Sequence, residues 1–473
     1  MMNAARFFAD AFSGHARRPR ALGTLLAGML LTLGLAVAGA PPAGAQPTQG
    51  SGSIYSRFGL GTLDAFSSSQ AQAMGEGGGL ALRSLNYASF ANPALWSDQE
   101  LTRLNIGARY RRVNARNAGG QTSGLSSGAL QSAQFSFPLY SGKLGVGVGF
   151  RPYSRTEYRV QSPFRPVPSG ESPAESARYR IDYRGEGGLR QISGGLGYRI
   201  GDALALGLRT DVIFGILESQ RHTGFSNRAR FSPTTLSTQT RLAGVTGTAG
   251  ALLSLDEVLR PNDALSVGAT FTLPTRLSGE RTRTLGSSLA RDSLLLGDDE
   301  TRAENGEITV PLSAGIGLSY KPNAPWTLIA EGRYEPWSGA ESNFDFARLP
   351  GMGALRDRAR LSVGAELLPA GDNRNATFFR RTAYRLGGYY EQTYVGAGVF
   401  PAVGLEAEGT DVDVLAATGG ISLPTPLYGT RIDVGFKVGT RGTTDAGLVR
   451  DVFYGLSLNV NIGERWFQRR KLR

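Results

Sequence analysis

The sequence has no cysteine and only two histidines, His15 and His222, among its 473 residues. The absence of cysteine excludes disulfide bonds, cysteine-ligated metals and a cysteine nucleophile. With so few histidines, a histidine-rich metal site is excluded as well. Lysine is almost as rare, and its four positions are Lys143, Lys321, Lys437 and Lys471. We therefore expect no metal, no cofactor and no enzyme activity that depends on these residue types.

The formal net charge is +12, and nearly all of the positive charge comes from arginine. A clustered basic surface would indicate a nucleic-acid partner. Here the arginines are spread along the whole chain and alternate with apolar residues, which favours a general arginine bias. Arginines inside or at the rim of a barrel can also meet anionic lipid head groups. We expect no nucleic-acid partner and contact with outer-membrane lipid.

Long apolar runs are missing everywhere except near the N-terminus. Residues 1–45 read as a signal peptide, with a basic start at Arg17–Arg20, an apolar run over 21–40 and a cleavage pattern at Ala43–Ala45. An uncleaved anchor helix is the alternative, because the run is nearly long enough to span a bilayer. After residue 45 no apolar run reaches the roughly 18 residues of a membrane helix. An exported chain of this kind is a soluble β protein or a membrane barrel.

A strict alternation of apolar and polar residues is present along the mature chain. Over 103–111, leucine, isoleucine, alanine and tyrosine alternate with arginine, asparagine and glycine, and 452–462 repeats the pattern. A strand places the two sets on opposite faces. The runs are long, about ten to fifteen residues, where a soluble strand has about five or six. An apolar face toward lipid and a polar face toward a lumen is typical of a transmembrane barrel.

The connections alternate between short turns and long polar segments, as in barrels with short periplasmic turns and long external loops. This pattern predicts an all-β fold, a transmembrane antiparallel barrel of about fourteen strands over 102–463. The expected strands are 102–113, 128–140, 143–157, 188–200, 203–217, 241–255, 263–275, 306–320, 326–337, 358–369, 377–394, 411–423, 430–440 and 448–463. The even number places both barrel ends in the periplasm of an outer membrane. The expected external loops are 158–187, 218–240, 276–305, 338–357 and 395–410.

Residues 46–101 differ from the rest, because they are rich in small residues and lack long alternation. They include the glycine-rich stretch Ala73–Leu82 and the motif Asn92-Pro93-Ala94. With the fourteen-strand pattern, these features resemble the FadL-type outer-membrane transporters of long-chain fatty acids and other hydrophobic compounds. The opening Tyr55–Gly61 and the ending Gly463–Phe467 with its basic tail resemble a Bacteroidetes-like branch of that family.

The resemblance implies that 46–101 is a hatch inside the lumen, with Asn92, Pro93 and Ala94 as its motif. It also implies a hydrophobic binding pocket and a sideways exit for substrate at a kink in the third strand. Pro152 is the physical counterpart, because proline cannot donate to the ladder and marks a bend or an edge. Pro152 equally suits a strand that simply leaves the membrane there. Loop 158–187 is polar, unlike the apolar capture loops of the family, which speaks against a fatty acid as the substrate.

Other motifs are more simply explained without chemistry. Gly145, Gly147 and Gly149 lack the helix of a phosphate loop and fit small residues on a lumen face. His222 lies in an expected loop and is best read as a solvated side chain. The acidic group 298–300 matches no complete cation loop and fits a solvated turn. We expect no catalytic residue.

Two functions remain. The first is passive uptake of a hydrophobic small molecule, fatty-acid-like or aromatic, past the hatch and into the membrane. The second is a FadL-like barrel that acts as a protein-secretion or assembly partner. In that case the basic tail 464–473 would dock a periplasmic protein. A continuous apolar lumen favours the first function, and a sealed lumen favours the second.

Overall fold

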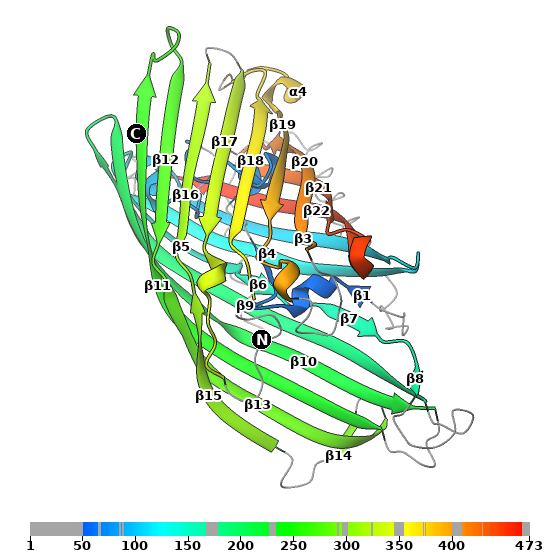
Figure 1. The fold of residues 1–473 in the computed structure, drawn as a ribbon. Helices are drawn as coiled ribbons and strands as arrows, with labels where there is room; N and C mark the ends of the chain where they lie inside the picture. Colours follow the sequence, from blue (N-terminus) through cyan, green and yellow to red (C-terminus); the bar gives the residue numbers. More distant parts are fainter. Residues whose placement is uncertain are drawn as a thin grey trace, which may run out of the picture. The chain divides into compact units, whose positions relative to one another are not determined.

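Strands that follow one another in the sequence pair around a closed barrel in the computed structural model (Figure 1). The structure describes residues 51–64, 68–84, 87, 89–166, 178–226, 233–290, 293–295, 301–322, 325–344, 354–371, 373, 375–399, 409–427 and 429–465. The expected signal peptide 1–45, the acidic group 298–300 and residues 466–473 of the expected tail lie outside the described residues. Those three expectations stay predictions.

Fourteen antiparallel strands form the barrel wall in the described part of the chain, as the sequence predicts. Two of the fourteen are interrupted once, so that β12–β13 and β15–β16 each run as one strand. Strand β22 pairs with β3 and closes the barrel. The strands are β3 (Thr102–Asn117), β4 (Thr122–Tyr140), β5 (Leu144–Pro152), β9 (Arg178–Ile200), β10 (Leu204–Phe225), β11 (Thr234–Asp256), β12 (Ala264–Thr272) with β13 (Thr275–Ala290), β15 (Thr301–Val310) with β16 (Ser313–Lys321), β17 (Trp326–Glu335), β18 (Arg358–Leu367), β19 (Ala383–Gln392), β20 (Asp413–Pro424), β21 (Arg431–Arg441) and β22 (Val449–Glu464).

The predicted alternation is confirmed by exposure. On β10, Leu208 is 64% exposed, whereas its neighbour Arg209 is 6% exposed. The last strand shows the same division, with Leu458 and Val460 exposed and Asn459 buried. Apolar side chains therefore cover the outside of the wall, and polar side chains point into the lumen. Among the residues that the structure describes, no helix is both long enough and apolar enough to span a bilayer.

Several predicted boundaries are wrong at the end of the barrel with long connections, called here the long-loop end. Residues 218–240 were expected as a loop, but β10 and β11 stay paired through Thr223 and Thr234. His222 is therefore a strand residue, and its Nδ1 lies 2.9 Å from the Thr235 hydroxyl. Cross-strand pairs of polar residues continue the ladder beyond the apolar band, where the sequence no longer alternates in hydrophobicity.

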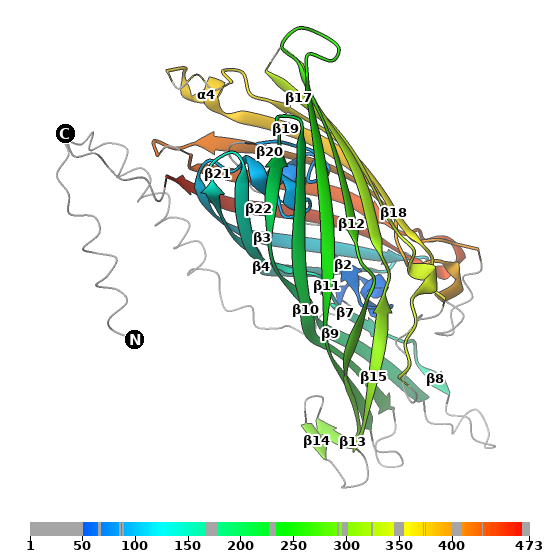
Figure 2. The same ribbon diagram turned by 90° about the vertical axis from the view of Figure 1, so that its left-hand side faces the viewer.

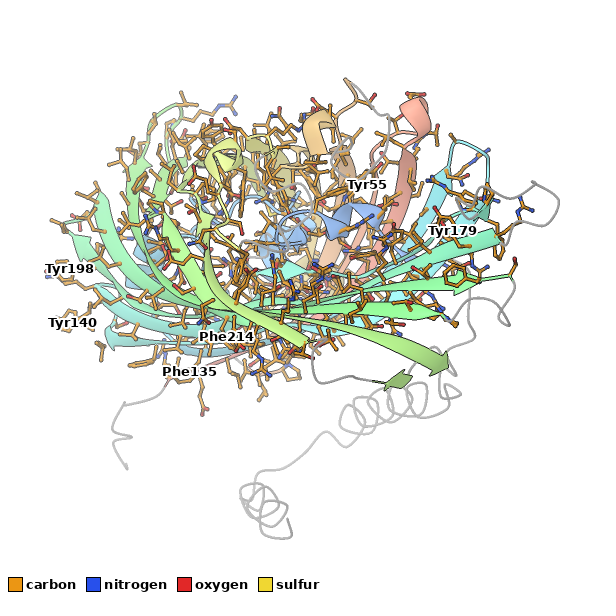
Figure 3. The ribbon with its side chains drawn as sticks, turned by 60° about the horizontal axis from the view of Figure 1, so that its bottom comes forward. Tyr55, Phe135, Tyr140, Tyr179, Tyr198 and Phe214 are labelled. Atoms are coloured by element: carbon orange, nitrogen blue, oxygen red, sulfur yellow. The ribbon has the colours of Figure 1, made fainter. Side chains whose placement is uncertain are left out.

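Two further corrections concern single strands. The third strand was expected to continue to residue 157, but β5 ends at Pro152. The expected strand 377–394 begins only at Ala383, because α4 (Phe378–Arg381) precedes it. Helix α4 lies at the opposite end, called the short-loop end, where Tyr140 and Tyr198 project outward from the wall (Figure 3). Aromatic side chains at this level are typical of a membrane–water interface.

The N-terminal segment, meaning the described residues between 51 and 101, lies within the ring of strands in both ribbon views (Figures 1 and 2). Its elements are β1 (Ser51–Gly52), η1 (Ile54–Arg57), β2 (Thr62–Leu63), α3 (Ser69–Ala73) and η2 (Pro93–Asp98). The remaining short elements belong to the connections, and they are β6 (Ser154–Arg155), β7 (Tyr158–Gln161), β8 (Arg165–Pro166), β14 (Ser293–Leu295), η3 (Trp337–Gly339), η4 (Ala397–Val399) and η6 (Asp445–Gly447). Most of the segment's described side chains are buried.

Candidate functional site: the occupied lumen

Four glycines face one another across four wall strands, beneath the motif Asn92-Pro93-Ala94 and the nearby Trp96. Strand pairing aligns Gly145 with Gly197, Gly197 with Gly207, and Gly207 with Gly250. We call these four residues the glycine row. A Cβ added at Gly250 would lie 2.8 Å from the Pro93 ring, and one at Gly197 or Gly207 would meet the backbone of Pro93. Only glycine permits this close approach of the two backbones.

Asn92 fastens the motif in place. Its side-chain amide donates to the carbonyl oxygens of Leu80 at 2.7 Å and Ala251 at 2.9 Å. Its side-chain oxygen accepts from the backbone N–H of Ala94 at 3.0 Å and so caps η2. Asn92 is fully buried, and every polar atom of its side chain has a partner. Such complete pairing is what a buried amide needs, and it fixes η2 against β11.

Other glycines serve large side chains of the segment in the same way. A Cβ at Gly147 or Gly149 would lie 2.6 Å from the rings of Trp96 and Phe90, respectively. Gly364 meets Met74 in the same manner, at 2.7 Å. The expectation that the alternating glycines of β5 are small residues on a lumen face is therefore correct. The sequence contained this signal as runs of glycine at every second position, but it could not say what they contact.

A charged layer crosses the lumen beneath the long-loop end. Asp64 of the segment pairs with Arg109 of β3 at 2.8 Å and with Arg155 at 3.5 Å. Glu76 pairs with Arg360 of β18 and with Lys437 of β21, the latter at 2.6 Å. Each acidic side chain comes from the N-terminal segment and each basic partner from β6 or a wall strand. Since buried charges need such partners, these pairs hold the segment against the wall.

The layer continues toward the short-loop end. Arg385 of β19 contacts Glu366 at 2.6 Å and Asp433 at 3.0 Å. The Tyr87 hydroxyl of the segment also bonds to Asp433. Near the rim, Asp98 pairs with Arg83 at 2.7 Å and with Arg199 of β9. We use the term charged layer for all of these pairs together.

Above the charged layer lies an apolar cluster at the long-loop end. It joins the start of the segment, the inward faces of β9 to β15 and several connecting loops. The stacked rings of Trp337 and Tyr394, 5.1 Å apart, lie within it, and the Tyr394 hydroxyl donates to the Phe58 carbonyl oxygen at 3.0 Å. The outer apolar cluster comprises Tyr55, Phe58, Leu60, Leu189, Ile213, Leu217, Leu242, Leu277, Ile308, Val310, Trp337, Ala340, Phe344, Leu355, Tyr394, Val395, Val399, Val412 and Leu448.

Two small cavities can be described in the lumen. One has a volume of about 90 Å³, and its lining includes Arg151, Arg209, Glu335 and Arg358 together with several threonines and leucines. The second has a volume of about 50 Å³ beside Glu76 and Arg109. Both are smaller than the roughly 150 Å³ apolar cavity that holds benzene in a well-studied protein. Within the described residues no group of three or more potential metal ligands is present.

The wall itself is interrupted after Pro152. Strand β5 pairs with β4 only from Ala133 to Tyr140, and in the described chain no other strand pairs with that edge of β4 from Thr122 to Ser132. Beyond Pro152 the chain turns inward, where Ser154–Arg155 (β6) pairs with β2 of the N-terminal segment. Pro152 therefore marks both the end of a wall strand and the start of a bend. Whether this proline serves a sideways exit or only marks where the strand leaves the membrane stays a prediction.

A family model described as BamG matches residues 31–473 of the sequence. The chain belongs to the BamG family. The comparison with curated proteins finds no match. The specific Bacteroidetes-like branch stays a prediction.

Solved structures share the fold at low sequence identity. The toluene transporter TbuX of Ralstonia pickettii is 15% identical, with a TM-score of 0.55 over 85% of this chain and 99% of that chain. A FadL homologue of Pseudomonas aeruginosa is 13% identical, with a TM-score of 0.56 over 85% and 98%. The monoaromatic hydrocarbon channel CymD is 15% identical, with a TM-score of 0.51 over 86% and 98%. The BamG-family barrel is therefore FadL-like in fold, which is the architecture of an outer-membrane barrel.

Proposed function

We propose that this barrel takes up hydrophobic small molecules passively across the outer membrane, with its short-loop end in the periplasm. The observation that carries the proposal is the order of the two lumen layers, apolar at the long-loop end and charged below it. An apolar molecule that enters at the long-loop end would part the buried side chains around Trp337 and Tyr394, which are apolar like the molecule itself. Apolar pockets with a few polar groups are the usual sites for such ligands. The similar folds that carry toluene and monoaromatic compounds support the same ligand class.

The charged layer gives the proposed path its direction. Moving an apolar molecule between the paired charges of Glu76, Arg360 and Lys437 would separate them without replacing their partners, which is costly in a buried setting. The straight route to the periplasm is therefore closed to an apolar molecule, and the remaining route is sideways. We propose the N-terminal segment, 46–101, as the hatch, Asn92, Pro93 and Ala94 as its anchoring motif, and the break after Pro152 as the lateral exit. The process needs neither a catalytic residue nor an energy source.

The decisive experiment is mass spectrometry of the protein purified from its own membrane, with lipidomics of what it carries. We expect a reproducible hydrophobic compound bound to the purified barrel and lost on denaturation. A variant with a polar outer cluster, Trp337→Gln, should carry less of it. A stoichiometric protein partner with no small-molecule ligand would contradict the uptake proposal.

A second function has its own observation in support. The two lumen cavities described above, of about 90 and 50 Å³, are small, and many charged side chains surround both. A closed barrel of this kind suits a protein that works through partners, such as a secretion or assembly component of the outer membrane. In that case the tail 464–473 is the proposed docking element for a periplasmic protein. The same purification separates the two functions, because this one expects the protein partner.

A further inference from the structure

A second weak point in the wall lies between two interrupted strands. Thr272 pairs with Ser313, and Thr275 pairs with Val310, so that two residues on each strand are left between the paired blocks. These are Leu273–Pro274 and Pro311–Leu312, and the register places Pro274 opposite Pro311. Neither proline has an N–H to donate, so the ladder cannot close at this level. We call these four residues the proline seam.

The opposite edge of the same strand is fastened. The backbone N–H of Leu273 donates to the Gly247 carbonyl oxygen of β11 at 2.9 Å. The Thr246 hydroxyl donates to the Leu273 carbonyl oxygen, and the Thr275 hydroxyl to the Val245 carbonyl oxygen, each at 2.7 Å. The hydroxyl groups of Thr246 and Thr275 therefore replace ladder bonds that are missing between this strand and β11. The unpaired edge is the one toward Pro311.

The seam is also the level at which the two faces of the wall change character. Below it, Phe271 of β12 and Ile316 of β16 are exposed on the outside. Above it, Leu277 and Ile308 are fully buried and belong to the outer apolar cluster. A shift of one residue in a strand exchanges its faces, and both strands make that shift at the prolines. The seam therefore lies where the lipid-facing apolar band ends, at the level of a membrane interface.

Directly behind the seam lies the larger lumen cavity. Leu273, Thr275, Pro311 and Ser313 line this cavity of about 90 Å³. The Leu273 side chain is at the same time 55% exposed on the outside. Leu273 thus lines the cavity and is also exposed on the wall. The cavity lining combines apolar, hydroxyl and charged side chains, and the Ser313 hydroxyl donates to the Glu335 carboxylate at 3.3 Å.

We propose that the proline seam is a lateral passage for small amphipathic molecules between this cavity and the membrane interface. The chemistry of the cavity selects an apolar body with a polar head, since hydroxyl and charged groups can pair with the head while Leu273 and Pro311 contact the body. The passage is distinct from the break after Pro152, which involves β4 and β5. It deepens the proposed uptake function and rests on it, because it names a ligand class and a route for that function.

The test uses the absence of cysteine from the chain. Thr270→Cys places one thiol on the cavity lining. The full barrel, reconstituted in phospholipid vesicles, is treated with N-(1-pyrenyl)maleimide dissolved in the bilayer. We expect labelling of Thr270→Cys, and at least a tenfold slower rate when Pro274→Val and Pro311→Val restore two N–H donors at the seam. Pro138→Val, a proline of β4 far from the seam in the ladder, is the matched control and should leave the rate unchanged.

Heat-modifiable migration on a gel confirms that each variant is folded before labelling. An equal rate with and without the two valines, or no labelling of Thr270→Cys at all, would overturn the passage. A second measurement locks the seam with Leu273→Cys and Leu312→Cys, which stand opposite each other. The same two strands carry an intact-ladder control, Ala269→Cys with Ile316→Cys. Oxidation of the first pair should slow the entry of 1-N-phenylnaphthylamine into the barrel at least fivefold, and reduction should restore the rate. Oxidation of the second pair should leave the rate unchanged.

The two measurements distinguish the proposals. Labelling reports only whether the cavity is reached from the bilayer, so it is independent of any natural substrate. If labelling behaves as expected but the purified barrel never carries a ligand, the passage at the proline seam is supported and the proposed uptake function is rejected. If the purified barrel carries a ligand but the labelling rate does not depend on the seam prolines, uptake is supported and this passage is rejected.

Discussion

The outer apolar cluster and the charged layer hold the same N-terminal segment by opposite means. The cluster packs Tyr55, Phe58 and Leu60 among rings and aliphatic side chains, without a requirement for exact partners. The charged layer fixes Asp64 and Glu76 through specific ion pairs. Apolar packing tolerates the exchange of one apolar neighbour for another, including a ligand, whereas a buried ion pair tolerates no loss of a partner. In the proposed function, this difference assigns capture to the first region and closure to the second.

The largest effect is expected when the charged layer loses one acidic side chain. Glu76→Gln leaves Arg360 and Lys437 without their shared carboxylate, and removing one partner of a buried pair costs about 3–5 kcal/mol. We expect higher ion conductance of the reconstituted barrel in a planar bilayer, because the segment no longer seals the lumen. Glu341→Gln changes an exposed loop side chain and should leave the conductance at the parent level. Equal conductance in all three proteins would show that Glu76 does not keep the lumen closed.

Capture should fail when the cluster loses its central ring. Trp337→Ala removes the stack on Tyr394 and a 2.9 Å hydrogen bond to Glu335, at a cost of about 3 kcal/mol, the lower end for a buried aromatic. We expect a lower unfolding temperature and several-fold weaker binding of 1-N-phenylnaphthylamine, with conductance unchanged. Trp326→Ala, on the outer surface at the short-loop end, is the control. Raised conductance in Trp337→Ala would show that the outer apolar cluster also keeps the lumen closed, so that the two regions do not have separate roles.

The glycine row holds the same N-terminal segment in a third way, by close contact with the backbone around Pro93. Gly207→Ala directs a methyl group at the backbone of Pro93, and overpacking of this kind costs about 1–3 kcal/mol. We expect a lower unfolding temperature and a modest rise in conductance. Gly332→Ala, a strand glycine with open space around its Cβ position, is the matched control. If the two alanines behave alike, the row does not seat the Asn92 motif.

The smallest effect belongs to a turn outside both regions. Burial raises the pKa of the Asp263 carboxyl. Hydrogen bonds from the backbone N–H groups of Leu259, Val258 and Arg260 and from the Tyr320 hydroxyl together lower it by more than burial raises it, so the pKa lies below its usual value. A lowered folded pKa stabilises the protein above the unfolded pKa, and this stabilisation is lost as the pH falls through the folded value. Asp263→Asn should therefore flatten the acid side of the stability profile, followed by unfolding at pH 3 to 7. A change in the conductance of Asp263→Asn at pH 7 would show that this turn affects the lumen.

The sequence alone determined the barrel, its strand number and the inward or outward direction of most wall residues. Alternation is a local property of each strand, so Leu104 and Asn105 reveal their faces without knowledge of their neighbours. The turn residues and the alternating length of the connections are equally local. The glycines of β5 were also readable as small lumen residues, because the pattern at 145, 147 and 149 is strictly periodic.

Only the tertiary structure decided what fills the barrel. The pairs of Glu76 with Arg360 and Lys437, and the contacts of the four aligned glycines with the segment around Pro93 and Trp96, join residues that are far apart in the chain. Their meeting depends on the register of every strand between them, and a charge or a glycine carries no local sign of its partner. The same holds for Pro274 and Pro311, which are ordinary prolines in the sequence and become a seam because two strands pair with those residues opposite each other.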